Sequence, residues 1–396
     1  MISDNMIRLA ASNSAIRAMF EEGLRLAAEY GRENVFDFSL GNPNFPAPPE
    51  VNRALRDILE EEESTLVHGY MTNAGFPDVR DTVAASLNER FGGTFGKENI
   101  IMTAGAAGGL NIILKTLLNP GDEVIVFAPY FLEYGNYVNN YGGVIMPVHS
   151  AEPDFQPDAK LLKAAVTKKT KAVIINNPNN PTGVVYSENT IRSISEALDE
   201  KQKELGSPVY LISDEPYREL CYDGHSAVWL PNCFKNTIVC YSWSKSLSLP
   251  GERIGYLAIP PQAEDGARIA EAAAIAGRVL GFINAPSLMQ RAAARCIRTS
   301  IDINCYDQNR KNLHGALTSL GFKTTYPAGA FYLWMKSPEP DEKVFVNKAK
   351  SLRLLLVPGS SFAGPGYVRI AYCVSPDMIP RSLPAFKELA GEYDLI

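Results

Sequence analysis

Residues 237–256 read TIVCYSWSKSLSLPGERIGY, an apolar, β-branched run that leads directly into hydroxyl groups, a lysine and an arginine. The run TIVCY is typical of a buried strand. In doubly wound sheets ligands bind beyond the carboxyl ends of the parallel strands, which is where Lys245 and Arg253 would lie. The stretch therefore indicates either ordinary loop chemistry or a site that holds an anion beside a nucleophilic amine.

The middle of the chain alternates short β-branched runs with longer helical patterns. This alternation predicts an α/β fold, a mainly parallel seven-stranded sheet with helices on both faces. Too few residues separate the last two strands for a crossover helix, so the last one is expected to run antiparallel. The expected strands are 99–103, 123–128, 143–148, 171–176, 209–214, 237–242 and 253–259, and the clearest helices are 108–118, 158–166 and 188–204.

The two ends of the chain have a different pattern. After one N-terminal helix, residues 41–50 read GNPNFPAPPE and form a turn-rich linker. An alanine-rich helix is expected near 285–298, and short strands follow it at 330–335, 354–357 and 367–371. We therefore expect a large domain over residues 51–287 and a smaller α+β domain built from both termini, residues 1–50 and 288–396.

Composition argues against several classes of protein. The net charge of -6 argues against a nucleic-acid or anionic-membrane partner. The first residues, MISDNMIRLA, lack the apolar core of a secretory signal, and no apolar run is long enough to cross a bilayer. Six cysteines without a CxxC pair indicate reduced thiols in a cytoplasmic protein, and four scattered histidines give no metal-ligand spacing, so no metal is expected.

Other predicted strand ends also have groups that suit a ligand. TAGAAGGL at 103–110 is a glycine turn running into a helix, whose free backbone N–H groups suit a phosphate. It has neither GxGxxG spacing nor a P-loop lysine, so an NAD-dependent or ATP-binding protein is not indicated. The motifs that follow the other predicted strands are PYF at 129–131, the rigid amide-rich loop NPNNPTG at 177–183 and DEPY at 214–217.

Each of these groups alone has an ordinary explanation as core packing or as a turn. A carboxylate at the end of an apolar strand, however, needs a cation or hydrogen-bond donors if it is buried. Together, at consecutive strand ends, the groups form the set needed to hold a flat, phosphorylated, cationic ring that bonds to a lysine as an imine.

In these motifs the chain resembles the class I/II aminotransferases, fold type I enzymes that depend on pyridoxal 5'-phosphate (PLP). The motifs occur in the family's order over most of the chain. Those that match most specifically are NPNNPTG at 177–183, DEPY at 214–217 and S-x-S-K-x7-R-x-G at 242–255. Weaker support comes from Tyr70 with Gly75, Gly105, Pro129-Tyr130 and the VRIAY strand that contains Arg369.

The resemblance implies catalytic roles for three residues. Lys245 would form the internal aldimine and then move protons between the substrate α-carbon and the cofactor, because desolvation can lower the pKa of a lysine enough for a neutral amine to act. Asp214 would pair with the pyridine nitrogen and keep it protonated. Tyr217, with Asn180, would hydrogen-bond the 3'-oxygen of the ring.

The resemblance also implies the remaining binding residues. Tyr130 would stack on the ring, and Tyr70 would reach the phosphate of a neighbouring subunit, so that a homodimer shares its active sites. Arg369 would bind the substrate α-carboxylate bidentately, with Asn180 and the Gly41 backbone assisting. The phosphate would be held by Ser242, Ser244, Arg253 and the backbone of Gly105, Ala106 and Ala107.

The glycine turn departs from the family pattern. Many relatives have Ser or Thr where this chain has Ala106 and Ala107, so the phosphate would rely more on backbone donors. Some dicarboxylate-using relatives place a basic side chain in this turn, and its absence leaves no obvious partner for a distal carboxylate. Arg278 could supply the charge, but a solvated helix position also explains it.

The resulting functional hypothesis is a ping-pong aminotransferase, in which an L-amino acid gives its amino group to the cofactor and a 2-oxo acid then takes it. A PLP-dependent C–S lyase or synthase of the same fold would use the same residues. A regulator that binds the cofactor without catalysis is the alternative from another class, although the chain has no basic N-terminal DNA-binding segment.

Overall fold

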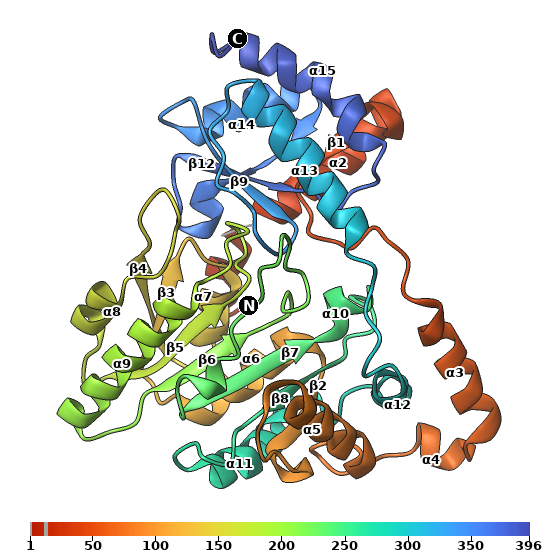
Figure 1. Ribbon diagram of the computed structural model, residues 1–396, viewed down its shortest axis with the longest axis vertical. Helices are drawn as coiled ribbons and strands as arrows, with labels where there is room; N and C mark the ends of the chain where they lie inside the picture. Colours follow the sequence, from red (N-terminus) through yellow and green to blue (C-terminus); the bar gives the residue numbers. More distant parts are fainter. Residues whose placement is uncertain (1, 12–14) are drawn as a thin grey trace.

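The computed structural model describes residues 2–11 and 15–396, and Figure 1 shows a large sheet with its helices beside a smaller unit of short strands and helices. The N-terminal residues expected to form one helix form two, α1 (Asp4–Ala11) and α2 (Ala15–Tyr30). Short 3-10 turns lie at Arg32–Asn34, Lys97–Asn99, Leu230–Asn232 and Gly359–Phe362.

The large sheet contains seven strands in the described part of the chain, as the alternating pattern predicts. From one edge to the other they are β2 (Ile100–Thr103), β8 (Gly255–Ala258), β7 (Thr237–Ser242), β6 (Tyr210–Asp214), β5 (Thr170–Asn176), β3 (Glu123–Ala128) and β4 (Val144–His149). β8 runs antiparallel to both of its neighbours, and the other pairs are parallel. The predicted reversal of the last strand is confirmed.

Both faces of this sheet are buried, because successive side chains of a strand point to opposite faces and helices cover each face. In β3, Val124 and Val126 belong to one apolar cluster, whereas Ile125 and Phe127 belong to another. This double burial explains why the strands are apolar almost throughout. The first cluster contains residues of α6 (Gly105–Leu117), α7 (Glu133–Asn139) and α11 (Gly266–Val279), and the second contains residues of α8 (Ala159–Ala165) and α9 (Glu188–Leu205).

A further helical group packs against the β2 and β8 side of the sheet. It consists of α3 (Pro49–Glu61), α4 (Ser64–His68), α5 (Pro77–Phe91) and α12 (Ser287–Arg295). In α12, Met289 and Ala293 share an apolar cluster with Val51 and Ile58 of α3. The domain boundary expected after residue 287 stays a prediction. Because α12 buries its apolar side against the larger unit, this packing favours a boundary after α12.

The smaller unit combines both ends of the chain. Its three-stranded antiparallel sheet has the order β11 (Val357–Pro358), β12 (Tyr367–Ala371), β9 (Tyr332–Lys336). β1 (Phe36–Asp37) pairs in parallel with β10 (Leu354–Leu355), which joins the N-terminal segment to the C-terminal one. The helices that pack here include α2, α13 (Asn304–Ser319), α14 (Glu342–Ser351) and α15 (Met378–Gly391).

None of the helices in residues 2–11 and 15–396 combines the length and the apolar character that a membrane span requires.

A buried ion pair joins Glu215, in the DEPY motif just after β6, to Arg218, the residue that follows the motif. Glu215 and Arg218 pair with side chains that are only 3% and 4% exposed, and the Glu215 carboxylate also accepts a hydrogen bond from Ser213 Oγ at 2.6 Å. The guanidinium lies 4.8 Å from the Trp229 ring centroid and 4.7 Å from that of Tyr241. Removing the carboxylate would leave a desolvated cation without its counter-ion.

We therefore expect Glu215→Ala to lower the free energy of unfolding by about 3 kcal/mol, because breaking a buried pair leaves an uncompensated charge. Urea denaturation measures the change. The matched control is Glu188→Ala, which breaks the exposed pair between Glu188 and Arg192, with side chains 61% and 59% exposed. That variant should lose less than about 0.5 kcal/mol, and equal losses in the two variants would contradict the account.

Candidate active site

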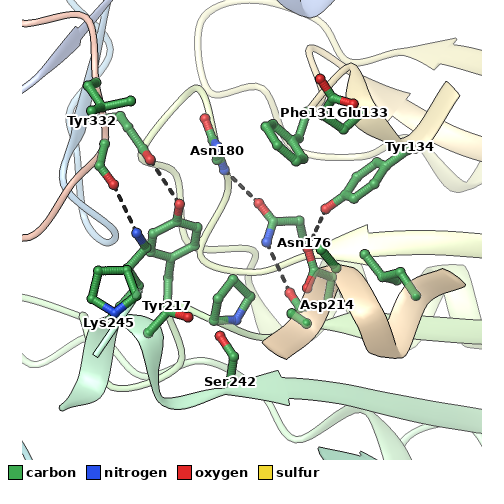
Figure 2. A pocket seen from close by; sticks show the side chains of 18 of the residues that line it. Phe131, Glu133, Tyr134, Asn176, Asn180, Asp214, Tyr217, Ser242, Lys245 and Tyr332 are labelled. Carbon is green, nitrogen blue, oxygen red and sulfur yellow. Dashed lines mark hydrogen bonds between the residues drawn. The ribbon is translucent and has the colours of Figure 1, made fainter. Parts of the chain in front are cut away.

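A cavity of about 540 Å³ lies at the carboxyl edge of the large sheet, between that sheet and residues of the smaller unit. Figure 2 shows Lys245, Tyr217 and Tyr332 toward one side of it, and Asp214, Asn176 and Tyr134 toward the other. Most of the residues proposed from the sequence lie in its wall. They are Gly41, Ala106, Ala107, Asn180, Asp214, Tyr217, Ser242, Ser244, Lys245, Arg253 and Arg369.

Lys245 reaches the cavity from the short helix α10 (Trp243–Ser246), which begins where β7 ends. Its Nζ donates a hydrogen bond to the Gly41 carbonyl at 2.8 Å and lies 5.3 Å from the Phe331 ring centroid. Burial disfavours the ammonium form and lowers the pKa of Lys245 to about 8. Roughly a tenth of the side chain is therefore the neutral, nucleophilic amine at pH 7.

Asp214 ends β6 and has one carboxylate oxygen without a partner. Its Oδ2 accepts a hydrogen bond of 2.5 Å from the Tyr134 hydroxyl, while Oδ1 is buried and has no hydrogen-bond partner among the described residues. Burial raises the pKa of Asp214 to about 7. Buried polar atoms are nearly always paired, so Oδ1 indicates that the cavity takes a ligand with a donor at this point.

Two amide side chains and two phenols, those of Asn176, Asn180, Tyr217 and Tyr332, add further polar groups to the cavity wall. Asn176 donates from Nδ2 to the Asp214 backbone carbonyl at 3.0 Å, and its Oδ1 accepts from the Asn180 backbone N–H at 2.7 Å. The hydroxyls of Tyr217 and Tyr332 lie 2.9 Å apart. Burial keeps the pKa of Tyr217 well above the ordinary value, so its phenol is a neutral donor.

Arg369 comes from β12 of the smaller unit and is 2% exposed. Its guanidinium donates to Asn180 Oδ1 at 3.1 Å and to the Ser39 carbonyl at 2.6 Å, while Nε has no partner in the structure as described. The rings of Tyr332 and Phe362 lie 4.4 and 4.6 Å from its central carbon. A fixed, partly unpaired guanidinium is suited to bind a carboxylate bidentately.

The start of α6 and Arg253 form a potential anion site. Gly105 has φ +69°, and a Cβ built on it would lie 2.8 Å from Arg253 Nη2. Arg253 itself has φ +54°, and its Nη1 donates to the Pro250 carbonyl at 3.0 Å. The buried Ser242 and Ser244 lie in the wall of the same cavity. Backbone N–H groups at a helix start, two hydroxyls and a guanidinium suit a phosphate.

Two of the proposed aromatic residues lie elsewhere. Tyr130 is buried beside the site, with its ring 6.4 Å from that of Tyr134, but the aromatic side chain that enters the wall is the next one, Phe131. The ring-stacking role of Tyr130 stays a prediction, and the position of Phe131 in the wall makes it a second candidate for that role. Tyr70 is 95% exposed and does not enter the cavity of its own chain.

The sequence interpretation missed several wall residues. Asn176 had a usable signal, since it is a polar residue that ends an otherwise apolar strand. Tyr134 lies one helical turn after the PYF motif, and this spacing is the signal that could have identified it. Tyr332 gave no signal, because it lies inside the apolar run AFYLWM. The cavity wall also includes Phe20, Leu40, Leu110, Glu133 and Tyr137.

A buried lysine of lowered pKa, an unpaired carboxylate and an anion site at one edge of this sheet are the groups that a PLP-dependent enzyme of fold type I requires.

Comparison with known proteins defines the family. Residues 33–386 match the family model for aminotransferase class I and II. The aspartate/prephenate aminotransferase of Thermus thermophilus is 30% identical over 361 residues, covering 89% of this chain and 90% of that protein. An amino transferase of known structure from Eubacterium rectale is 43% identical, with a TM-score of 0.97 over 100% of this chain and 99% of that one.

A solved aspartate aminotransferase from Thermus thermophilus, in a structure with maleate, is 28% identical, with a TM-score of 0.85 over 95% of this chain and 96% of that one. The chain belongs to the class I and II aminotransferases, whose members use PLP. It is an aminotransferase, as the resemblance implies, and the lyase, synthase and regulator alternatives are not favoured.

The raised pKa of Asp214 makes the stability of the protein without cofactor depend on pH. The pKa of Asp214 is higher in the folded protein than in the unfolded chain. The protonated carboxyl therefore makes its full contribution to the free energy of unfolding below about pH 4, and this contribution is lost as pH rises through 7. Asp214→Asn keeps the shape and the hydrogen bond from Tyr134 without a titrating group.

We expect the stability of Asp214→Asn relative to the parent protein to rise by roughly 2–4 kcal/mol between pH 4 and pH 8. Urea denaturation of both apoproteins at several pH values measures it. A difference that does not change with pH would contradict the account of Asp214 as a desolvated carboxyl.

Proposed function

We propose that this cavity binds PLP and carries out a ping-pong transamination in which Lys245 bonds to the cofactor and moves the proton. The observation that supports this most strongly is the unpaired Oδ1 of Asp214 in the same cavity as Lys245, whose amine is partly neutral at neutral pH. A pyridine nitrogen that bears a proton would pair with that oxygen.

The ring end of the cofactor would be held by residues of the large sheet. Asp214 would keep the pyridine nitrogen protonated, and Tyr134 would fix the orientation of that carboxylate through its hydrogen bond to Oδ2. Asn180 and Tyr217 would hydrogen-bond the 3'-oxygen, and an aromatic side chain of the PYF motif would cover the ring face. Together these contacts would orient the ring and exclude water from it.

The phosphate end would be held by Ser242, Ser244, Arg253 and the backbone from Gly105 to Ala107. The backbone of Gly105 lies so close to Arg253 that a β-carbon at this position would contact the guanidinium. Tyr70 of the partner subunit would complete this site, which makes the active enzyme a homodimer. The 95% exposure of Tyr70 in its own chain is consistent with such a role.

Arg369 would bind the α-carboxylate of the amino acid, with Asn180 and the Gly41 backbone assisting. When bound, PLP supplies an electron sink for the charge left on the substrate α-carbon. Lys245 would take the proton from that carbon and return it at the cofactor C4' atom. Its lowered pKa favours this task, because general bases work best when their pKa lies near the working pH.

We also propose a cytoplasmic location. All six cysteines lie in the described residues and are free thiols, which suits a reducing compartment.

The direct test of the Lys245 assignment is chemical trapping. The purified protein with PLP should be yellow, and borohydride should attach the pyridoxyl group to the peptide that contains Lys245, as read by mass spectrometry. Addition of an amino acid should convert the spectrum to that of the pyridoxamine form. Label on another lysine, or a colourless protein, would overturn the assignment.

The phosphate assignment predicts a specific effect of Gly105→Ala. The new methyl group would collide with Arg253, so PLP affinity should fall by at least about tenfold, or 1.4 kcal/mol. The matched control is Gly206→Ala, which has a similar φ of +66° but open space around its β-carbon. Absorbance titration of the apoproteins should show unchanged affinity in the control, and an equal loss in both variants would contradict the assignment.

The shared active site predicts complementation between inactive variants. Tyr70→Ala and Lys245→Ala homodimers should each be impaired, whereas unfolding and refolding them together should restore about a quarter of the parental activity, because half of the dimers are mixed and each mixed dimer has one intact site. No gain on mixing would place Tyr70 in the site of its own chain or outside it.

A further inference from the structure

Part of the cavity wall consists of apolar side chains. Phe20 comes from α2, Leu40 from the linker before α3, and Phe131 from the turn after β3. Figure 2 shows Phe131 beside Glu133 near the top of the cavity. Glu133 is the one acidic wall residue besides Asp214 in the described chain, and its carboxylate accepts a hydrogen bond from Asn136 Nδ2 at 2.8 Å.

Every basic side chain that the described residues contribute to this wall already has a partner or an assigned role. Lys245 donates to Gly41, Arg253 donates to Pro250 beside the anion site, and Arg369 donates to Asn180 and Ser39. Arg278, the candidate named from the sequence, lies exposed in the last turn of α11 and does not enter the wall.

Against the wall that this chain contributes, a substrate with a second carboxylate would bring an anion beside aromatic and aliphatic carbon, in a wall that also contains Glu133. Removal of a carboxylate from water without a cation or donors is costly, and a neighbouring like charge increases that cost. An apolar side chain in the same place would gain from the burial of its surface.

We propose that this enzyme takes amino acids with one carboxylate and an uncharged, apolar or aromatic side chain, and that it rejects dicarboxylic amino acids. The proposal rests on the proposed function, since it assumes that Arg369 binds the α-carboxylate. The proposed substrate class differs from that of the two Thermus thermophilus relatives, an aspartate/prephenate aminotransferase and an aspartate aminotransferase.

The test uses the PLP-loaded enzyme at a concentration where it is fully assembled. Conversion of the cofactor spectrum is followed with phenylalanine, leucine, aspartate, glutamate and lysine. Phenylalanine or leucine should convert the enzyme at least roughly 100-fold more efficiently than aspartate or glutamate. Higher efficiency with aspartate, glutamate or lysine would overturn the substrate class while leaving transamination intact. Failure of all five would overturn the proposed residue roles and the inference with them.

A binding measurement separates recognition from chemistry. Calorimetric titration should give tighter binding of 3-phenylpropanoate than of maleate, by at least about tenfold. Equal or tighter binding of maleate would indicate a cation supplied by the second subunit and would overturn the proposal.

A pair of variants tests the wall directly. Phe20→Arg adds a cation to the wall, and it should strengthen maleate binding by about tenfold and weaken that of 3-phenylpropanoate. Leu24→Arg adds the same charge one turn later on α2, at a residue that is 52% exposed and outside this wall, and it should change neither affinity. The same gain in both variants, or no gain in Phe20→Arg, would contradict the assignment of Phe20 to the substrate side chain.

Discussion

The whole site depends on one electrostatic constraint, the burial of ionisable groups that the protein does not pair with one another. Within residues 2–11 and 15–396, Asp214 keeps one oxygen without a donor, and Lys245 has the Gly41 carbonyl as its one hydrogen-bond partner. Burial moves the pKa values of both groups toward neutrality, upward for the carboxyl and downward for the amine. Such an arrangement costs stability in the free protein, and a ligand with a protonated ring nitrogen beside Asp214 and an aldehyde beside Lys245 would offset part of that cost.

The fold explains how these groups come together. In a parallel sheet the strands end at one edge, so residues far apart in sequence, such as Asn176, Asp214 and Lys245, meet around one cavity. The smaller unit adds Arg369 from β12, which contacts Asn180 and the Ser39 carbonyl. The site is therefore built at the junction of the two units, and any movement between them would change the position of the guanidinium relative to Lys245.

The sequence predicted the fold well because the parallel strands are buried on both faces and are therefore apolar almost throughout. The reversal of β8 followed from the short segment after β7. The sequence is less informative where side-chain direction or distant partners decide the outcome. The motif PYF does not show that Phe131, and not Tyr130, enters the cavity. Tyr332 contacts Tyr217 across a separation of 115 residues, and an apolar strand pattern gives no sign of that contact.

The most direct measurement of the central claim is a crystal structure of the protein grown with PLP. The account predicts electron density joining Lys245 Nζ to the cofactor, the pyridine nitrogen within hydrogen-bond distance of Asp214 Oδ1, and the phosphate between the start of α6 and Arg253. A cofactor bound elsewhere, or one in this cavity that leaves Oδ1 of Asp214 without a donor, would contradict it.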